Sequence, residues 1–433
     1  MPSSFVLSGL VAHTPTKDRF QIMEPGYLLC LDGQVGGLFE RLPQAYAGLP
    51  CYDFPRALIL PGLCDAHLHA PQYAYRGTGM DLQLLDWLNR ITFPQESLYA
   101  DALHALHAYE PFADALKNSF TTRAAVFATS HTPATMTLMR LLERSGLCCY
   151  VGKVSMDRNA PESLLSAPGA DARADLEAWL GDALTGFERT RPILTPRFAP
   201  SCSDALLALL GELRKAYRLP VQSHLSENLD EVAWVRRLFA QDSCYAGVYD
   251  RFGLLRGEDV VMAHGVHPTP EEEALLREAG TLIAHCPASN TNLASGIAPV
   301  RRYLDEGVRV CLGTDIAGGH DLSMFRAIAD AVQVSKLRSH FTHGAEKPLT
   351  LSEAFYLATK GAAGLFGPVG SFETGREFDA LVLDDSALAS PLPLSAPERI
   401  ERAVYLDREL VLLHKFVRGQ RIPLGNGKEG ASP

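Results

Sequence analysis

The sequence of 433 residues has no hydrophobic run long enough to cross a membrane, so we expect no membrane association. Its first residues, MPSSFVLSGLVAH, have neither the charged start nor the small-residue cleavage site of a secretory signal. The nine cysteines are an odd number and none forms a CxxC pair, which excludes a disulfide framework and a redox motif. These absences predict a reduced, cytoplasmic protein.

The sequence also lacks the features of nucleic-acid-binding proteins and of nicotinamide-dependent oxidoreductases. Lys and Arg total 40 against 50 Asp and Glu, a net charge of −10, and no basic patch or arm stands out. Binding to a nucleic-acid backbone is therefore not expected. No glycine-rich turn follows the first buried strand, which excludes a nicotinamide-dependent oxidoreductase.

The middle of the chain alternates short apolar, β-rich runs with amphipathic stretches of helical length. The eight runs are 58–69, 119–127, 148–155, 193–198, 220–225, 260–265, 281–286 and 309–314. The helical stretches include 99–117, 133–143, 171–189, 204–217, 229–240 and 270–279. This alternation predicts an α/β protein with a parallel sheet, and eight units over about 300 residues predict a (β/α)₈ TIM-like barrel. A doubly wound open sheet is the structural alternative.

The two ends of the chain have a different character. Residues 4–56 and 378–423 contain short strand-like runs separated by turns, with little helical periodicity. Each end is too short to bury a core alone, so we expect the two to pair in a small β-sandwich domain. The predicted domains are the barrel and the two parts of the β domain, namely 58–367, 1–57 and 368–433.

The run from Leu58 to His69, LILPGLCDAHLH, ends in two histidines two residues apart. Side chains on a strand alternate faces, so His67 and His69 point the same way. Reactive groups of such barrels lie at the carboxyl ends of the strands, which adds His224 on the fifth strand and Asp315 on the eighth. Three imidazoles and a carboxylate suit Zn²⁺, or Fe²⁺, with one position left for a water that the metal would activate as hydroxide.

Proton carriers are expected beside this metal. Glu227 follows His224 by three residues, where the strand gives way to a loop, although a carboxylate there could simply favour a helix start. Asp315 could also accept the proton of the water. His264, at the end of the sixth strand, is predicted to polarise the substrate rather than bind the metal. His285 is more typical of a hydrogen-bonded core histidine.

The number of metals follows from the third and fourth strands. A carbamylated lysine at a strand end can bridge two metals, and Lys153 falls on the third strand. The fourth strand ends instead in Arg197, which cannot be carbamylated in the same way. We therefore expect one metal per subunit.

Five motifs, PGLCDAHLHAPQ, SHLSEN, MAHGVH, AHCPASN and GTDIAG, together resemble the metal-dependent deaminase branch of the amidohydrolase superfamily. Within it, the segments 69–73, 81–96, 194–198, 224–232 and 313–328 are similar to those of guanine deaminases. The resemblance covers nearly the whole chain. It implies a homodimer with one zinc ion per subunit, held by His67, His69, His224 and Asp315.

The resemblance also implies contacts to a small purine. Gln72 offers a paired donor and acceptor to a base edge, and Arg197 can donate to a carbonyl such as O6. Phe198 offers an aromatic face, although core packing is its alternative role. His264 and Glu227 would lie at the reacting edge.

The implied reaction is the zinc-dependent hydrolytic deamination of guanine to xanthine and ammonia. Glu227 would protonate a ring nitrogen, and Asp315 or Glu227 would take the proton of the water. The alternatives are a deaminase of another purine, a pterin or a triazine-like heterocycle, a ring-opening hydrolase, and a non-enzymatic relative. His320 and Asp321 depart from the residues expected in their loop, so the fine substrate preference stays open.

Overall fold

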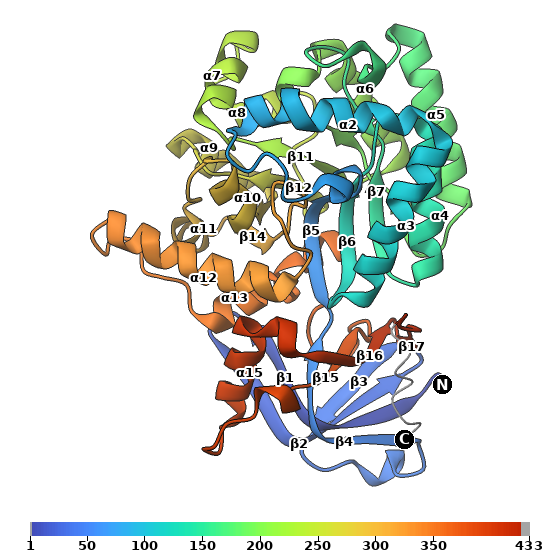
Figure 1. The fold of residues 1–433 in the computed structure, drawn as a ribbon, viewed down its shortest axis with the longest axis vertical. Coiled ribbons are helices and arrows are strands. Elements are labelled where there is room, and N and C mark those ends of the chain that lie inside the picture. The colour runs from blue at the N-terminus through green and yellow to red at the C-terminus, as the bar shows by residue number, and fades with distance from the viewer. Residues whose placement is uncertain (1, 426–433) are drawn as a thin grey trace.

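The structure is a computed structural model that describes residues 2–425. It is a mixed α/β protein, as predicted. An α/β part occupies the upper portion of Figure 1, and a sheet built from both ends of the chain lies below it. The blue strands from the start of the chain lie beside the red strands from its end in this lower part.

All eight predicted strand regions contain strands, and every pair of neighbours in the α/β part runs parallel. One four-stranded sheet comprises β5 (Leu63–His69), β6 (Thr121–Phe127), β7 (Cys148–Gly152) and β9 (Thr190–Pro192). The other comprises β11 (Val221–Leu225), β12 (Val260–His264), β13 (Leu282–His285) and β14 (Arg309–Leu312). The short strands β8 (Val154–Ser155) and β10 (Thr195–Pro196) pair with each other.

Backbone contacts connect the two sheets on both sides. On one side Leu194 forms a parallel bridge with Val221. On the other, Asp315 N donates to His67 O at 2.8 Å, and His69 N donates to Ile316 O at 2.9 Å. The carboxyl ends of strands from both sheets therefore face one region.

The chain around the fourth predicted strand, 193–198, pairs in two short pieces. Pro192 and Pro196 each end one of these pieces, and neither has a backbone N–H to donate to a neighbouring strand. The chain pairs with β7 up to Pro192, and with β8 from Thr195 onward.

The six predicted helical stretches are confirmed as α3 (Ala102–Asn118), α4 (Thr132–Ser145), α5 (Gly169–Thr185), α6 (Asp204–Tyr217), α7 (Leu229–Leu238) and α9 (Pro270–Ala279). Shorter elements follow the strands elsewhere: α1 (Leu84–Trp87), α2 (Phe93–Ser97), α8 (Tyr245–Arg251), α10 (Pro287–Asn292) and α11 (Val300–Glu306). The last helices are α12 (Met324–Phe341), α13 (Leu351–Leu357), α14 (Ala363–Phe366) and α15 (Ala396–Tyr405).

Helix α6 shows how local sequence sets these elements. The Ser203 side chain accepts a hydrogen bond from Leu206 N and so caps the first turn. Leu206, Leu210 and Leu213 recur at helical spacing and are buried, which turns one face of the helix toward the core.

The two ends of the chain form one seven-stranded sheet, in the order β17-β16-β15-β4-β1-β2-β3. Its strands are β1 (Phe5–Thr16), β2 (Arg19–Leu31), β3 (Gln34–Phe39), β4 (Cys51–Pro61), β15 (Ala380–Asp384), β16 (Val411–Val417) and β17 (Gln420–Arg421). The two ends of the chain therefore pair with each other, whereas the predicted β-sandwich stays a prediction. Strand β4 joins the two ends, since it pairs with β1 along one edge and with β15 along the other.

The apolar run that carries His67 and His69 belongs to both parts of the molecule. Its first residues, Leu58–Pro61, pair with β15 in the terminal sheet, and its last seven form β5. Only Gly62 separates the two strands. A Cβ atom there would lie 2.2 Å from Thr122 Oγ1, so the close approach of β6 requires glycine. The predicted domain limit at residue 57 stays a prediction, and the pairing of β4 extends across it.

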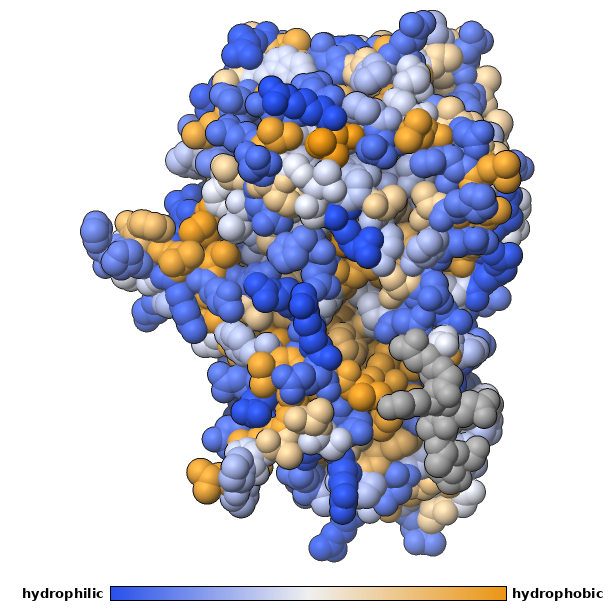
Figure 2. Space-filling model, viewed as in Figure 1, coloured by the Kyte–Doolittle hydropathy of each residue, from blue (hydrophilic) through white to orange (hydrophobic). Residues whose placement is uncertain are grey.

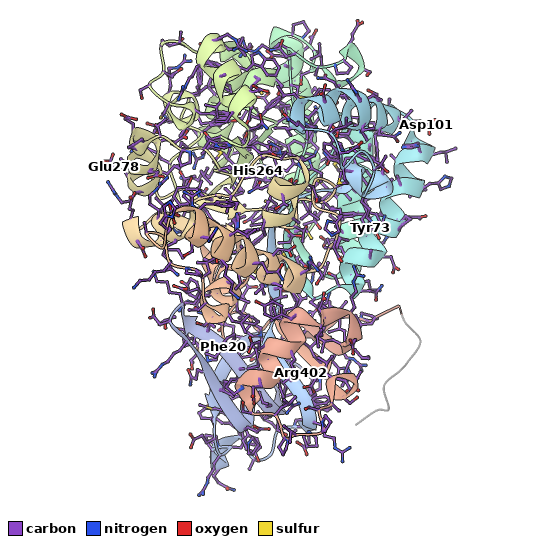
Figure 3. The ribbon with its side chains drawn as sticks, turned by 60° about the vertical axis from the view of Figure 1, so that its left-hand side comes forward. Phe20, Tyr73, Asp101, His264, Glu278 and Arg402 are labelled. Carbon is purple, nitrogen blue, oxygen red and sulfur yellow. The ribbon has the colours of Figure 1, made fainter. Side chains whose placement is uncertain are left out.

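The interior of the α/β part is apolar, and the functional side chains lie inside it. Figure 3 places His264 within the upper part, whereas Phe20 and Arg402 lie in the lower part. Figure 2 shows a largely hydrophilic surface, with hydrophobic side chains gathered on the projecting part of α12, which carries Leu337 and Phe341. No helix within residues 2–425 has both the length and the apolar composition of a membrane-crossing segment.

Lys415 of β16 is a buried lysine between the terminal sheet and the α/β part. Its Nζ donates to Lys117 O at 2.7 Å and to Thr121 O at 2.9 Å. Burial lowers the pKa of Lys415 from 10.5 to about 7. These two hydrogen bonds can be made by the neutral amine, which has two N–H groups.

Lys415→Met should weaken the pH dependence of stability in mildly alkaline solution. Between about pH 7 and the ordinary pKa of 10.5, the unfolded chain binds a proton at this lysine that the folded protein does not bind. The free energy of unfolding therefore rises with pH in this window, and the variant loses that contribution. Urea unfolding at several pH values measures it, with the exposed Lys336→Met as control. The same slope in the wild type and in Lys415→Met would contradict the prediction.

Candidate active site

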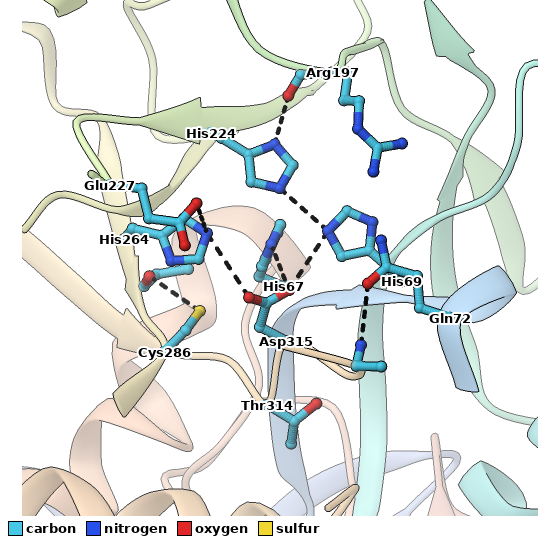
Figure 4. Close-up of polar contacts among 12 residues, drawn as sticks. His67, His69, Gln72, Arg197, His224, Glu227, His264, Cys286, Thr314 and Asp315 are labelled. Carbon is cyan, nitrogen blue, oxygen red and sulfur yellow. Dashed lines mark hydrogen bonds and ion pairs between the residues drawn. The ribbon is translucent and has the colours of Figure 1, made fainter. Parts of the chain in front are cut away.

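Buried histidine and carboxylate side chains meet at the carboxyl ends of β5, β11, β12 and β14 (Figure 4). His67 Nε2 lies 3.2 Å from Asp315 Oδ1, and His69 Nε2 lies 3.4 Å from the same oxygen. His69 Nε2 is also 3.1 Å from His224 Nε2. The structure therefore brings together the four residues that the sequence predicted as metal ligands.

The protonation of these groups suits metal ligation. Burial lowers the pKa of His67, and lowers that of His69 and His224 well below 6.5, so the three imidazoles are neutral at neutral pH. Burial alone would raise the pKa of Asp315, but the neighbouring His67 overcomes this and brings it to about 2. Metal ligands must be in these forms, neutral imidazole and ionised carboxylate.

The arrangement of the imidazole nitrogens also fits a cation. His224 Nδ1 donates to Arg197 O at 2.5 Å, so the lone pair of its Nε2 points at His69. His67 Nε2 is buried and has no hydrogen-bond partner. It lies near Asp315 Oδ1, as does His69 Nε2, so a divalent ion held at these atoms would give the lone pair of His67 Nε2 a partner.

The backbone turns sharply where these strands end. Ser226, His264 and Asp315 have φ angles of 47°, 77° and 48°, in the left-handed region that side chains other than glycine rarely occupy. Each such conformation costs about 1–3 kcal/mol and persists only where its surroundings hold it. Here the turns direct His264 and Asp315 into the same cavity.

Glu227 and His264 lie beside the proposed ligands. His264 Nε2 is 3.4 Å from Glu227 Oε2 and 3.8 Å from Asp315 Oδ2. Its Nδ1 contacts Asn290 Oδ1 at 2.9 Å, and because that oxygen only accepts, Nδ1 carries the hydrogen. Burial raises the pKa of Glu227 well above 4.5, assisted by the charges of Glu231 and Asp315. A carboxyl group with such a pKa can carry a proton at neutral pH.

His264 could also contribute a ligand atom. Its ring lies with those of His67 and His224 in a group whose ligand atoms are all within 4.8 Å of one another. The contact between its Nδ1 and Asn290 leaves Nε2 facing Glu227 and Asp315. This direction suits the predicted role at the reacting edge of a substrate.

The predicted substrate contacts line one cavity with these groups. Gln72, Arg197 and Phe198 lie in its wall together with His264 and Glu227. Leu84 and Trp87 of α1 contribute apolar surface. A cavity with apolar walls and a few converging polar groups is typical of a small-molecule site.

Glu96 is a residue of this site that the sequence prediction missed. It lies on α2, is 1% exposed, and its Oε1 and Oε2 accept hydrogen bonds from Arg197 at 3.1 and 2.5 Å. Gln72 Nε2 donates to Glu96 Oε1 at 3.0 Å. Glu96 ends one of the segments that resemble guanine deaminases, but no spacing in the sequence connects it to Arg197.

Asp65 was also missed, although strand alternation could have indicated it, since it precedes His67 by two residues on β5. Its carboxylate accepts hydrogen bonds from Thr314 N at 2.9 Å and from Thr314 Oγ1 at 2.5 Å. It thereby connects β5 to the segment after β14, and so supports His67 and Asp315. Phe127, at the end of β6, packs against His67 with ring centroids 4.9 Å apart.

Other residues considered in the sequence lie elsewhere. Lys153 forms an ion pair with Asp175 of α5. His285 is buried and lines a different cavity. His320 Nδ1 lies 3.2 Å from Asn292 Nδ2, and Asp321 Oδ1 accepts a hydrogen bond from Ser323 N at the start of α12. Neither of these two residues lines the cavity described above.

Comparison with known proteins identifies the family of this chain. Residues 58–422 match the model of the Amidohydrolase family. This chain belongs to the amidohydrolase family. The predicted resemblance is confirmed, and the match begins in β4, just before the two histidines of β5.

Within the family, the chain is similar to guanine deaminases. It is 40% identical over 402 residues to the guanine deaminase of Homo sapiens, covering 88% of this chain and 87% of that protein. It is 34% identical over 380 residues to that of Escherichia coli, covering 85% and 83%. The solved structure of guanine deaminase from C. acetobutylicum, with guanine bound in its active site, has 43% identity and a TM-score of 0.93. That alignment covers 97% of this chain and 100% of the other.

Proposed function

We propose that this protein hydrolyses guanine to xanthine and ammonia, and so acts in purine catabolism. One observation carries the proposal: the polar groups suited to a purine edge, Gln72 and Arg197, line the same cavity as His69, His224 and Asp315. The similarity to a guanine deaminase with bound guanine supports it.

We propose that His67, His69, His224 and Asp315 hold one Zn²⁺ ion per subunit, with Fe²⁺ as the alternative. Such an ion lowers the pKa of a bound water toward neutrality and so supplies a nucleophile. The ion pair of Lys153 with Asp175 supports one metal rather than two, because it keeps this lysine paired outside the cluster.

The chain's own residues then carry protons between water and base. Asp315 accepts a proton from the attacking water, and Glu227 donates one to a ring nitrogen, which makes the adjacent carbon electrophilic. A C–O bond forms at that carbon, and His264 steadies the oxygen by hydrogen bonding. Glu227 then takes the proton of the new hydroxyl group and passes it to the amino group, so that the C–N bond breaks and ammonia leaves. The proton held by Asp315 returns to Glu227, which restores both carboxyl groups to their starting forms.

The substrate lies between Phe198 and the polar wall of the cavity in this proposal. Gln72 reads the purine edge with one donor and one acceptor, and Arg197 donates to the oxygen on the six-membered ring. Phe198 packs on the flat face of the base.

We extend the proposal to the barrel, the oligomeric state and the location of the protein. We propose that the two parallel sheets, joined through Leu194 and Asp315, act as one (β/α)₈ barrel that presents its strand ends to the substrate. We also propose a homodimer in the cytoplasm.

An assay of ammonia release tests the substrate directly. The purified, zinc-loaded protein is expected to release ammonia from guanine, and to form xanthine in equal amount. Parallel reactions contain 8-oxoguanine, adenine, cytosine and isoxanthopterin. Activity on one of these with none on guanine would contradict the proposal and assign the site to another heterocycle.

A further inference from the structure

We infer that Glu96 is a positioning residue that sets which purine edge Gln72 and Arg197 recognise, an inference that rests on the proposed function. Glu96 is not a predicted contact to the substrate. It acts through two residues that are, and helix α2 brings it to them beyond the carboxyl ends of β5 and β6 (Figure 1).

The neighbours of Gln72 fix the orientation of its side-chain amide. The two ends of an amide side chain have similar shape, so only their partners decide which end points where. Gln72 Nε2 lies 3.0 Å from Glu96 Oε1, which only accepts when ionised. Gln72 Oε1 lies 3.2 Å from Ala317 N, which only donates. These two partners admit one orientation and leave one N–H and one lone pair of Gln72 for a base.

Glu96 and Phe93 together orient Arg197. Its Nη1 and Nη2 both donate to the carboxylate of Glu96, and this paired geometry fixes the plane of the guanidinium. Phe93 precedes Glu96 by one helical turn, and its ring centroid lies 5.3 Å from Arg197 Cζ. Helix α2 therefore holds Arg197 by charge and by an aromatic face together.

Glu96 also balances the charge of Arg197. Glu96 and Arg197 are 1% and 2% exposed, so the pair is removed from water. The carboxylate cancels the charge of the guanidinium, and a neutral base binds without bringing a counter-charge into the cavity. With the pair intact, Arg197 recognises its substrate through directed N–H groups rather than as a free cation.

Glu96→Gln tests the inference by comparing two substrates. Guanine has an oxygen on the six-membered ring, whereas 2-aminopurine keeps the reacting amino group but lacks that oxygen. A misdirected Gln72 and Arg197 should lower kcat/KM for guanine by about ten- to a hundredfold, mainly through KM. The value for 2-aminopurine should change much less, so the preference for guanine falls. A purely structural role would lower both values equally.

Three measurements accompany the kinetic comparison. Metal content should equal that of the wild type, because Glu96 contacts none of the proposed ligands. Glu353→Gln is the matched control, since it removes another carboxylate paired with an arginine, Arg301, away from the cavity. It should leave the ratio of the two substrates unchanged. Glu96→Asp keeps the charge and should retain more of the guanine preference than Glu96→Gln. It also serves as the test if Glu96→Gln does not fold.

The outcomes separate this inference from the proposed function. A wild-type protein without activity on guanine overturns the proposed function, whatever Glu96 does. A wild-type protein active on guanine, together with an unchanged substrate ratio in Glu96→Gln and in Glu96→Asp, overturns the role of Glu96 alone.

Discussion

Glu227→Gln is expected to lower kcat for guanine by a factor of about 10²–10⁴, the usual contribution of a positioned acid–base group. Glutamine has nearly the same shape and can still accept the hydrogen bond of Ser295, but it cannot donate a proton and take it back. The buried site loses a titratable group rather than a packing contact. Steady-state kinetics with guanine measure the effect.

Binding measurements show whether the loss lies in chemistry. Metal content and the dissociation constant for guanine should stay within a few-fold of the wild-type values, since Glu227 is not among the proposed ligands. Glu353→Gln again serves as control, since it makes the same exchange of glutamate for glutamine away from the cavity. Near-wild-type turnover in Glu227→Gln would assign the proton transfer to another residue.

The second large effect is expected from His67→Ala. The imidazole of His67 approaches Asp315. Its ring centroid lies within 5.5 Å of the ring centroids of His69, His224 and His264. Removal takes away one of the four predicted ligands, and the variant should retain less than about a tenth of the wild-type metal with no measurable turnover. Metal analysis of the purified protein gives the result without reference to activity.

His285→Ala is the matched control for this experiment. His285 is also a buried histidine at a strand end, but it lines a different cavity. This variant should keep its metal. Equal metal content in His67→Ala and the wild type would mean that the predicted ligand set is wrong.

Much of the site could be predicted from sequence because strands impose simple rules. The two-residue spacing of His67 and His69 fixes a shared face, and the strand-end rule adds His224 and Asp315 without knowledge of any contact. The structure brings all four together. The strand-end lysine was less informative, since Lys153 pairs with Asp175 instead of facing the cluster.

Glu96 could not be predicted because nothing local marks it. It lies in a short helix that is not part of the regular alternation of strands and helices. Its partner Arg197 is 101 residues away in the chain. A pairing over that separation depends on how the segment between β5 and α3 folds over the strand ends. Sequence periodicity describes regular elements and contains no such information.

For the terminal sheet, the sequence predicted that both ends of the chain form strands, but not the order in which these strands pair. Periodicity indicated strands at both ends of the chain, and both ends contain strands. The order of these strands depends on which of them pair. The position of β4 between β1 and β15 connects the two ends of the chain, and strand patterns alone do not specify such partners.

The place of β4 in the sheet has a consequence for biosynthesis. β4 ends at Pro61, and its neighbour β15 begins only at Ala380. During synthesis on the ribosome, the edge of β4 that pairs with β15 therefore stays unpaired until almost the whole chain has been made. An open edge is a template for pairing with other chains. Newly made protein is thus most prone to aggregate before its last strands emerge, and slower synthesis of the C-terminal segment would prolong that interval.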